Sequence, residues 1–125
     1  MADLSPAYTV KFMKGARDDV RALDGSVRKR LRKSIEKKLQ THPADYGKPL
    51  SGKLAGYWSF AFAAHRIIYR IYEDLKLVVI CAVGPRHAEH SSDVYLVFES
   101  LVRAGTTARQ IMETLDVPPK HKKTT

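Results

Sequence analysis

The chain has 125 residues, which is enough for one domain with a buried core. Its 22 Lys and Arg residues outnumber its 13 Asp and Glu residues, so the formal net charge is +9. We therefore expect an anionic partner, either nucleic acid or an acidic protein. The alternative is a basic surface that only keeps the protein soluble. A hydrophobic content of 44% excludes general disorder, and the single cysteine, Cys81, excludes an internal disulfide.

The first elements of the chain are predicted to be a strand and a helix. The segment "YTVKF" (8–12) alternates between residue types and is rich in β-formers, which predicts a short strand. Apolar residues then recur at helical spacing at Met13, Ala16, Val20 and Leu23. We expect Asp18 and Asp19 early in this helix, where its dipole favours acidic side chains.

A second, strongly basic helix is predicted over 26–41, with Ser26 as its N-cap. Its apolar stripe consists of Val27, Leu31, Ile35 and Leu39. Seven cations and one acid, Glu36, fill much of the remaining surface, and residues 1–56 as a whole hold thirteen basic and six acidic residues. This helix face is therefore either heavily solvated or a surface for an anionic partner.

Three strands follow a loop that is predicted over 41–56 from its prolines and glycines. They are "YWSFAF" (57–62), "HRIIYRIY" (65–72) and "LKLVVICAV" (75–83), and the links between them are short enough for antiparallel hairpins. The predicted fold class is α+β, ordered β-α-α-β-β-β, with an antiparallel sheet and the two N-terminal helices on one face.

The C-terminal part is predicted to add helices and a basic tail. One helix covers "VYLVFESLVRA" and ends at Gly105, and another begins at Thr107 with Gln110 in a capping-box arrangement. We therefore divide the chain into a domain over 1–96 and a helical extension with a basic tail over 97–125.

Three observations bear on where the chain works. No run approaches the roughly 20 apolar residues of a membrane helix. The N-terminus lacks the layout of a signal peptide. A single cysteine without a disulfide partner is typical of a protein in a reducing compartment. Together these observations predict a cytoplasmic protein that does not enter a membrane.

A cluster of reactive side chains follows the last strand directly, in "GPRHAEHSSDVY" (84–95). Arg86, His87, His90 and Tyr95 are residue types that bind phosphate and move protons. His87 and His90 also have a His-x-x-His spacing, but no third ligand is evident, so we expect no metal site and no cofactor.

Four motifs in this order resemble the RelE/ParE superfamily of bacterial and archaeal toxins over about residues 6–96. They are "YTVKF" before an Ala/Leu helix, "PLSGKLAGYW" before the sheet, "HRIIYRIY" within it, and "GPRH…VY" after it. The resemblance implies the toxin of a type II toxin–antitoxin system. Relatives of the ribonuclease type cut messenger RNA in the ribosomal decoding site without a metal, whereas the ParE branch poisons DNA gyrase.

The resemblance also implies site residues and partners. The ribonuclease pattern falls on Arg66, Arg86 and Tyr95, with His87 as a further acid or base. Arginine matches phosphate oxygens through its planar fork, and we expect Arg66 and Arg70 to share one wet sheet face. The expected partners are the ribosome, messenger RNA and an acidic antitoxin, the last in a hetero-oligomer with the toxin.

This chain departs from the ribonuclease pattern at the first strand of the sheet. Relatives often carry lysines there, whereas "YWSFAF" has no charged residue. Lys48 and Lys53 in the preceding loop are candidates to reach the same phosphates. The alternatives are a ParE-like gyrase inhibitor, which is not an enzyme, and an attenuated toxin fold that serves only as an interaction module.

Overall fold

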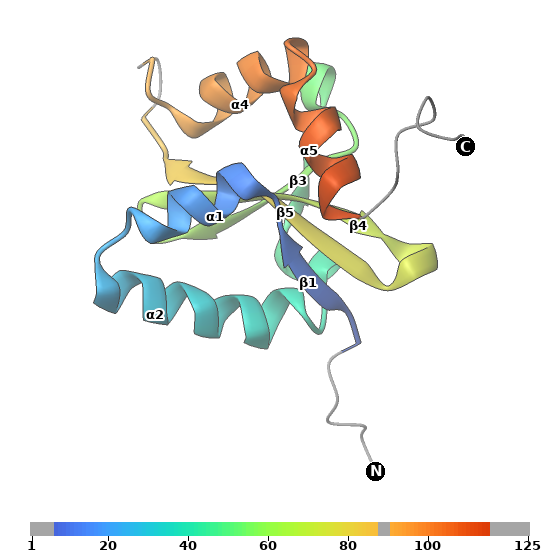
Figure 1. Ribbon diagram of the computed structural model, residues 1–125. Helices are drawn as coiled ribbons and strands as arrows, with labels where there is room; N and C mark the ends of the chain where they lie inside the picture. The colour runs from blue at the N-terminus through green and yellow to red at the C-terminus, as the bar shows by residue number, and fades with distance from the viewer. Residues whose placement is uncertain (1–6, 88–90, 116–125) are drawn as a thin grey trace, which may run out of the picture.

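The computed structural model describes residues 7–87 and 91–115, in which a five-stranded sheet lies between helices on both faces (Figure 1). The strand order is β1-β5-β4-β3-β2. The strands are β1 (Thr9–Phe12), β2 (Lys48–Pro49), β3 (Trp58–Phe62), β4 (His65–Tyr72) and β5 (Leu77–Pro85). The predicted α+β class is confirmed.

All strand pairs are antiparallel except β1 with β5, in which Thr9 lies opposite Leu77 and Phe12 opposite Ile80. Strand β2 was missed in the sequence because two residues in a Pro- and Gly-rich loop carry no periodic signal. The predicted loop also contains the one-turn helix α3 (Pro43–Tyr46) and a 3₁₀ turn, η2 (Gly52–Leu54). A second 3₁₀ turn, η3 (Glu73–Leu75), joins β4 to β5.

Helix α1 (Lys14–Arg21) follows β1 directly and covers the part of the β5 edge that β1 does not reach. The Met13 N–H donates to the carbonyl of Ile80 at 3.0 Å, and the Val83 N–H donates to Oδ2 of Asp19 at 3.0 Å. The expectation that Asp19 complements the helix dipole was wrong, because α1 begins at Lys14 and its first turn contains no acid. Asp19 instead satisfies a backbone donor at the sheet edge.

Helix α2 (Gly25–Ser34) continues into a π-helical segment, η1 (Ile35–Leu39), and covers one face of the sheet. The predicted stripe is confirmed at Leu31, Ile35 and Leu39, which are buried. Its first member, Val27, is half-buried. Steps of four residues drift around a helix with 3.6 residues per turn, and the wider π-turn offsets this drift. The N-cap is Asp24, not Ser26, because Oδ2 of Asp24 accepts the Ser26 N–H at 3.3 Å.

Helices α4 (Val94–Arg103) and α5 (Thr106–Thr114) cover the opposite face (Figure 1). Phe98 is fully buried and packs edge-on against Tyr57, with ring centroids 5.0 Å apart. The capping box expected between Thr107 and Gln110 does not form. Gln110 instead accepts the Gly15 N–H through Oε1 at 3.0 Å and ties α5 to α1.

The predicted division between residues 96 and 97 falls inside α4 and remains a prediction. The predicted basic tail lies outside the described residues. Cys81 is 2% exposed, and burial raises the pKa of its thiol to about 12, so it is an unreactive core residue. None of the helices in residues 7–87 and 91–115 has the length and apolar character needed to cross a membrane.

Candidate functional site

Arg66 lies on β4, in the middle of the sheet, between two strands whose facing residues are small. Its partners are Ala61 on β3 and Gly84 on β5. The side chain is half-buried, and Nη1 donates to the carbonyl of His65 at 2.9 Å. Small neighbours on both sides leave the guanidinium accessible on the face that α4 partly covers.

The Tyr95 hydroxyl reaches the same face from the first turn of α4. It lies 2.6 Å from Oγ of Ser59, a buried residue on β3. Ser59 is two residues from Ala61, which pairs with Arg66, so Ser59 and Arg66 point to the same side of the sheet. Sequence reasoning missed Ser59, because only the strand register and the packing of α4 bring it to Tyr95.

Arg86 follows the end of β5 and joins this group. Its backbone N–H donates to the carbonyl of Ala64 at 2.9 Å, and its guanidinium carbon lies 5.1 Å from the centroid of the Tyr95 ring. Nη1 also lies 2.6 Å from Oδ1 of Asp93, in a salt bridge that leaves 39% of the Arg86 side chain exposed. Since a guanidinium has five N–H donors, Arg86 retains capacity for a second anion.

The Asp93 carboxylate connects Arg86 to the first turn of α4. Its carboxylate accepts from Arg86, from the His87 N–H at 2.7 Å and from the Tyr95 N–H at 3.1 Å, so it is also the N-cap of α4. Burial alone would raise the pKa of this carboxyl, but the hydrogen bonds outweigh burial and the pKa is lowered. The position of Asp93 directly before the apolar helical pattern of α4 is the sequence signal that predicts this N-cap.

His87 lies beside Arg86, and its side chain is on the surface. His90 and Glu89, from the His-x-x-His motif, lie outside the described residues. Across residues 7–87 and 91–115, no group of three His, Cys, Asp or Glu side chains is arranged to hold a metal ion.

Lys48, Lys53 and Arg70, the three further residues expected to bind phosphate, have different surroundings in the structure. Lys48 on β2 lies opposite Ser59, so it projects to the face of Arg66 and is exposed. Lys53 lies 3.5 Å from Glu99 of α4, in an exposed salt bridge. Arg70 lies over the rings of Tyr57 and Tyr72, at 5.1 and 5.5 Å from their centroids.

The expectation of one continuous wet face through Arg66 and Arg70 was therefore wrong. Ile68 lies between them in the sequence and is fully buried. Helix α4 packs over the middle of this face through Tyr95 and Phe98, and Arg70 lies over the ring of Tyr57. The structure thus brings Arg86, Tyr95 and Ser59 into contact, and strand register places Arg66 and Lys48 on the same side of the sheet. Groups of these types can bind an anion and exchange a proton with it.

Comparison with known proteins defines the family. A family model described as the ParE toxin of the type II toxin–antitoxin system parDE matches residues 10–89. The chain therefore belongs to the ParE toxin family, within the RelE/ParE superfamily that its motifs resemble. The matched region includes Arg66 and Arg86 and ends before α4.

Individual relatives agree with this assignment. Toxin RelG of Mycobacterium tuberculosis is 33% identical over 88 residues, which cover 70% of this chain and 95% of RelG. A second relative comes from the crystal structure of the toxin–antitoxin complex RelBE2 from the same organism. Its similar chain is 32% identical to this chain, with a TM-score of 0.62, and the match covers 69% of this chain and 98% of that one. The intact Escherichia coli RelBE complex, with a TM-score of 0.55, 22% identity and coverage of 64% and 98%, shares the fold.

Proposed function

We propose that the chain is a messenger-RNA endoribonuclease that acts on the translating ribosome, as the toxin of a type II toxin–antitoxin system. The observation that carries the proposal is the grouping of Arg66 and Arg86 with the Tyr95 hydroxyl on one side of the sheet. Membership of a toxin family and similarity to RelG support it. Translation takes place in the cytoplasm, which is where we expect this activity.

The proposed reaction is attack of a ribose 2′-OH on the adjacent phosphate. A bond forms between the 2′-oxygen and phosphorus, the bond from phosphorus to the 5′-oxygen breaks, and a 2′,3′-cyclic phosphate remains. Arg66 and Arg86 would stabilise the charge on the pentavalent phosphate, because preplaced cations act strongly where little water enters. Lys48 is a further cation on the same side of the sheet by strand register.

Two protons move in this reaction. One group takes the proton of the attacking 2′-OH, and another supplies a proton to the departing 5′-oxygen. Tyr95 and His87 are the candidates for these roles. Ser59 would hold the Tyr95 hydroxyl in place through their 2.6 Å contact, so that it meets the substrate in one orientation.

The proposed partner is an acidic antitoxin that binds the toxin in a hetero-oligomer. Similar chains occur in structures whose names describe toxin–antitoxin complexes, including RelBE2 and RelBE. The net charge of +9 on this chain suits an acidic protein.

Primer extension on a translated message after induced expression tests the activity. We expect cuts within codons from the wild-type chain. Arg66→Ala should reduce cutting on the order of 100-fold, because one preplaced phosphate donor contributes about that much. Arg109→Ala, which removes an exposed arginine of α5, should cut as the wild type does. Equal cutting by Arg66→Ala and wild type would contradict the assignment.

A second candidate function is inhibition of DNA gyrase without catalysis. Two observations favour it: the matching family model is that of ParE, and strand β3 has no charged residue. It predicts a DNA-damage response with intact message in the same cells. A chain that causes neither effect and no growth defect would instead be an interaction module.

A further inference from the structure

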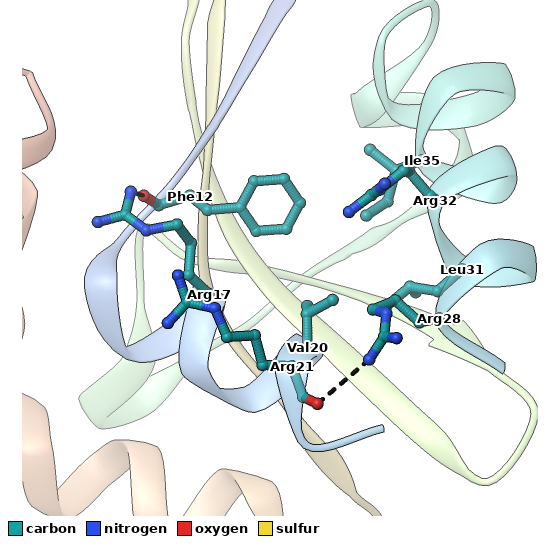
Figure 2. Close-up of a pocket in the computed structure, with 8 residues that line it drawn as sticks. All are labelled: Phe12, Arg17, Val20, Arg21, Arg28, Leu31, Arg32 and Ile35. Carbon is teal, nitrogen blue, oxygen red and sulfur yellow. Dashed lines mark hydrogen bonds between the residues drawn. The ribbon is translucent and has the colours of Figure 1, made fainter. Parts of the chain in front are cut away.

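Two pockets of the protein differ sharply in charge. The pocket between α1 and α2, drawn in Figure 2, has an apolar lining with four arginines around it, Arg17, Arg21, Arg28 and Arg32. Another pocket, of about 240 Å³, lies where α1, α4 and α5 meet the end of β5. Of the described residues that line this second pocket, none is Lys or Arg and one, Asp19, is acidic. We call it the Asp19 pocket.

Most of the wall of the Asp19 pocket is apolar. Met13 and Phe98 are buried, whereas Val97 and Leu101 on α4 are 44% and 38% exposed, so the apolar lining extends from the core to the surface. A closed apolar cavity of about 150 Å³ is already large enough to bind benzene. The Asp19 pocket therefore has room for one aromatic ring or a short aliphatic chain together with a small polar group.

The Asp19 carboxylate is the charged group of this wall, and it is only partly satisfied. Oδ2 accepts the Val83 N–H at 3.0 Å, but the carboxylate has no ion pair within residues 7–87 and 91–115. Burial raises the pKa of this carboxyl, the hydrogen bond from Val83 lowers it, and the charge of Asp18 raises it, with a net rise. A positive charge beside Asp19 would favour the ionised carboxylate and offset the cost of its burial.

Thr107, in the first turn of α5, adds a second unsatisfied polar group to the same wall. The residue is 1% exposed, and its Oγ1 has no hydrogen-bond partner within the part of the chain that the structure describes. A buried hydroxyl without a partner costs free energy. Because a hydroxyl oxygen accepts hydrogen bonds, an occupant with N–H groups is of the kind that can supply one.

We infer that the Asp19 pocket binds a small hydrophobic amine, whose ammonium group pairs with the Asp19 carboxylate while its apolar body lies against α4. An anionic molecule would meet a carboxylate and no cation in this lining, and a purely apolar molecule would leave Asp19 without a counter-ion. A mainly apolar pocket with a few polar groups that fix the orientation of the ligand is typical of small-molecule sites.

The site depends on a part of the chain that the family model does not cover. That model matches residues 10–89, whereas Val97, Leu101 and Thr107 lie on α4 and α5. The inference is also independent of the proposed function, because none of the groups proposed to cut RNA lines this pocket.

Isothermal titration calorimetry of the full chain with 2-phenylethylamine tests the inference at neutral pH. We expect saturable binding with a Kd on the order of 1 mM or tighter, which is reasonable for a ligand of about nine non-hydrogen atoms. Two control molecules each remove one feature. 2-Phenylethanol replaces the ammonium with a neutral hydroxyl and ethylamine lacks the ring, and both should bind about 10-fold more weakly or worse.

The decisive comparison uses two variants of α1 with the same change of charge. Asp19→Asn removes the charge in the pocket and keeps an oxygen that can accept the Val83 N–H, whereas Asp18→Asn alters an exposed neighbour that does not line the pocket. Asp19→Asn should weaken binding of 2-phenylethylamine about 10-fold or more and change binding of 2-phenylethanol by no more than about 3-fold. Asp18→Asn should leave the binding of both molecules within about 3-fold of the wild type.

Backbone amide shifts in the ¹H–¹⁵N spectrum of the wild-type chain locate the bound amine without any substitution. They should move at Val83 and Thr107 and stay unchanged at Arg32, which lines the pocket between α1 and α2. Three results would overturn the inference: no saturable binding of 2-phenylethylamine, equal loss in the two Asn variants, or shifts confined to α2. None of these measurements involves cleavage of message, so either proposal can fail while the other stands.

Discussion

At the scale of single residues, the site depends on contacts between distant parts of the chain. Tyr95 and Ser59 are 36 positions apart and meet through their hydroxyls. The sequence predicted Tyr95 from a motif, but nothing near Ser59 in the sequence marks it as a partner. Residue types that carry chemistry can be found in a sequence, whereas the residues that position them depend on strand register and helix packing.

Asp93 is predicted to control both the stability of α4 and the placement of Arg86. Asp93→Ala removes the N-cap and leaves Arg86 without its carboxylate, so it should lower the free energy of unfolding by about 1–3 kcal/mol. Urea denaturation at neutral pH measures this. Asp74→Ala, at an exposed acid in η3, is the control and should change little.

The lowered pKa of Asp93 also predicts a pH dependence. A carboxyl whose pKa is lower in the folded than in the unfolded chain stabilises the fold above its unfolded pKa, near 4. That stabilisation is lost as the pH falls through the folded pKa. Between about pH 5 and about pH 2, Asp93→Asn should therefore lose less stability than the wild type loses. An identical acid dependence of the two proteins would contradict this role.

Gly47 is predicted to be required by the position of Tyr69. A Cβ at residue 47 would overlap the Tyr69 hydroxyl, which is buried and donates to the carbonyl of Pro43 at 2.6 Å. Gly47→Ala should therefore destabilise the fold by about 1–3 kcal/mol. At Gly25 the nearest atom is 3.7 Å away and belongs to the flexible Arg28, so thermal melting of Gly25→Ala should show no loss.

At the scale of elements, long periodic segments were predictable and short ones were not. The strand over 65–72 and the stripe of α2 follow from their residue patterns. The strand predicted over 75–83 is present but runs over 77–85. Strand β2 and helix α3 have two and four residues, and their conformation comes from tertiary contacts. The position of α1 was equally hidden, because the hydrogen bond from Val83 to Asp19 spans 64 positions.

Helix α4 is predicted to be part of the core and of the site together. Phe98 is fully buried against Tyr57, so Phe98→Ala should cost about 3–5 kcal/mol. Leu96→Ala is the matched change on the same helix, where the side chain is 46% exposed, and should cost far less. Chemical denaturation of both variants measures the difference, and similar losses would show that α4 does not belong to the core.

At the scale of the molecule, the sheet separates two cationic features. The contact of Tyr95 with Ser59 lies on the α4 side of the sheet, and a pocket between α1 and α2 is lined by Arg17, Arg21, Arg28 and Arg32. The sequence predicted an excess of positive charge in residues 1–56, but not that part of it surrounds an apolar pocket. That arrangement depends on the angle at which the two helices pack, and the number of charged residues does not predict this angle.

The central claim is that Tyr95, held by Ser59 beside Arg86 and on the sheet face of Arg66, takes part in cutting messenger RNA. The most direct measurement is the rate of codon cleavage on translated message by Tyr95→Phe, which removes one oxygen and keeps the ring under Arg86. Tyr46→Phe, at an exposed ring on α3, is its control. We predict that Tyr95→Phe still folds but cuts on the order of 100-fold more slowly, while Tyr46→Phe cuts normally. Equal rates for the two variants would contradict the claim.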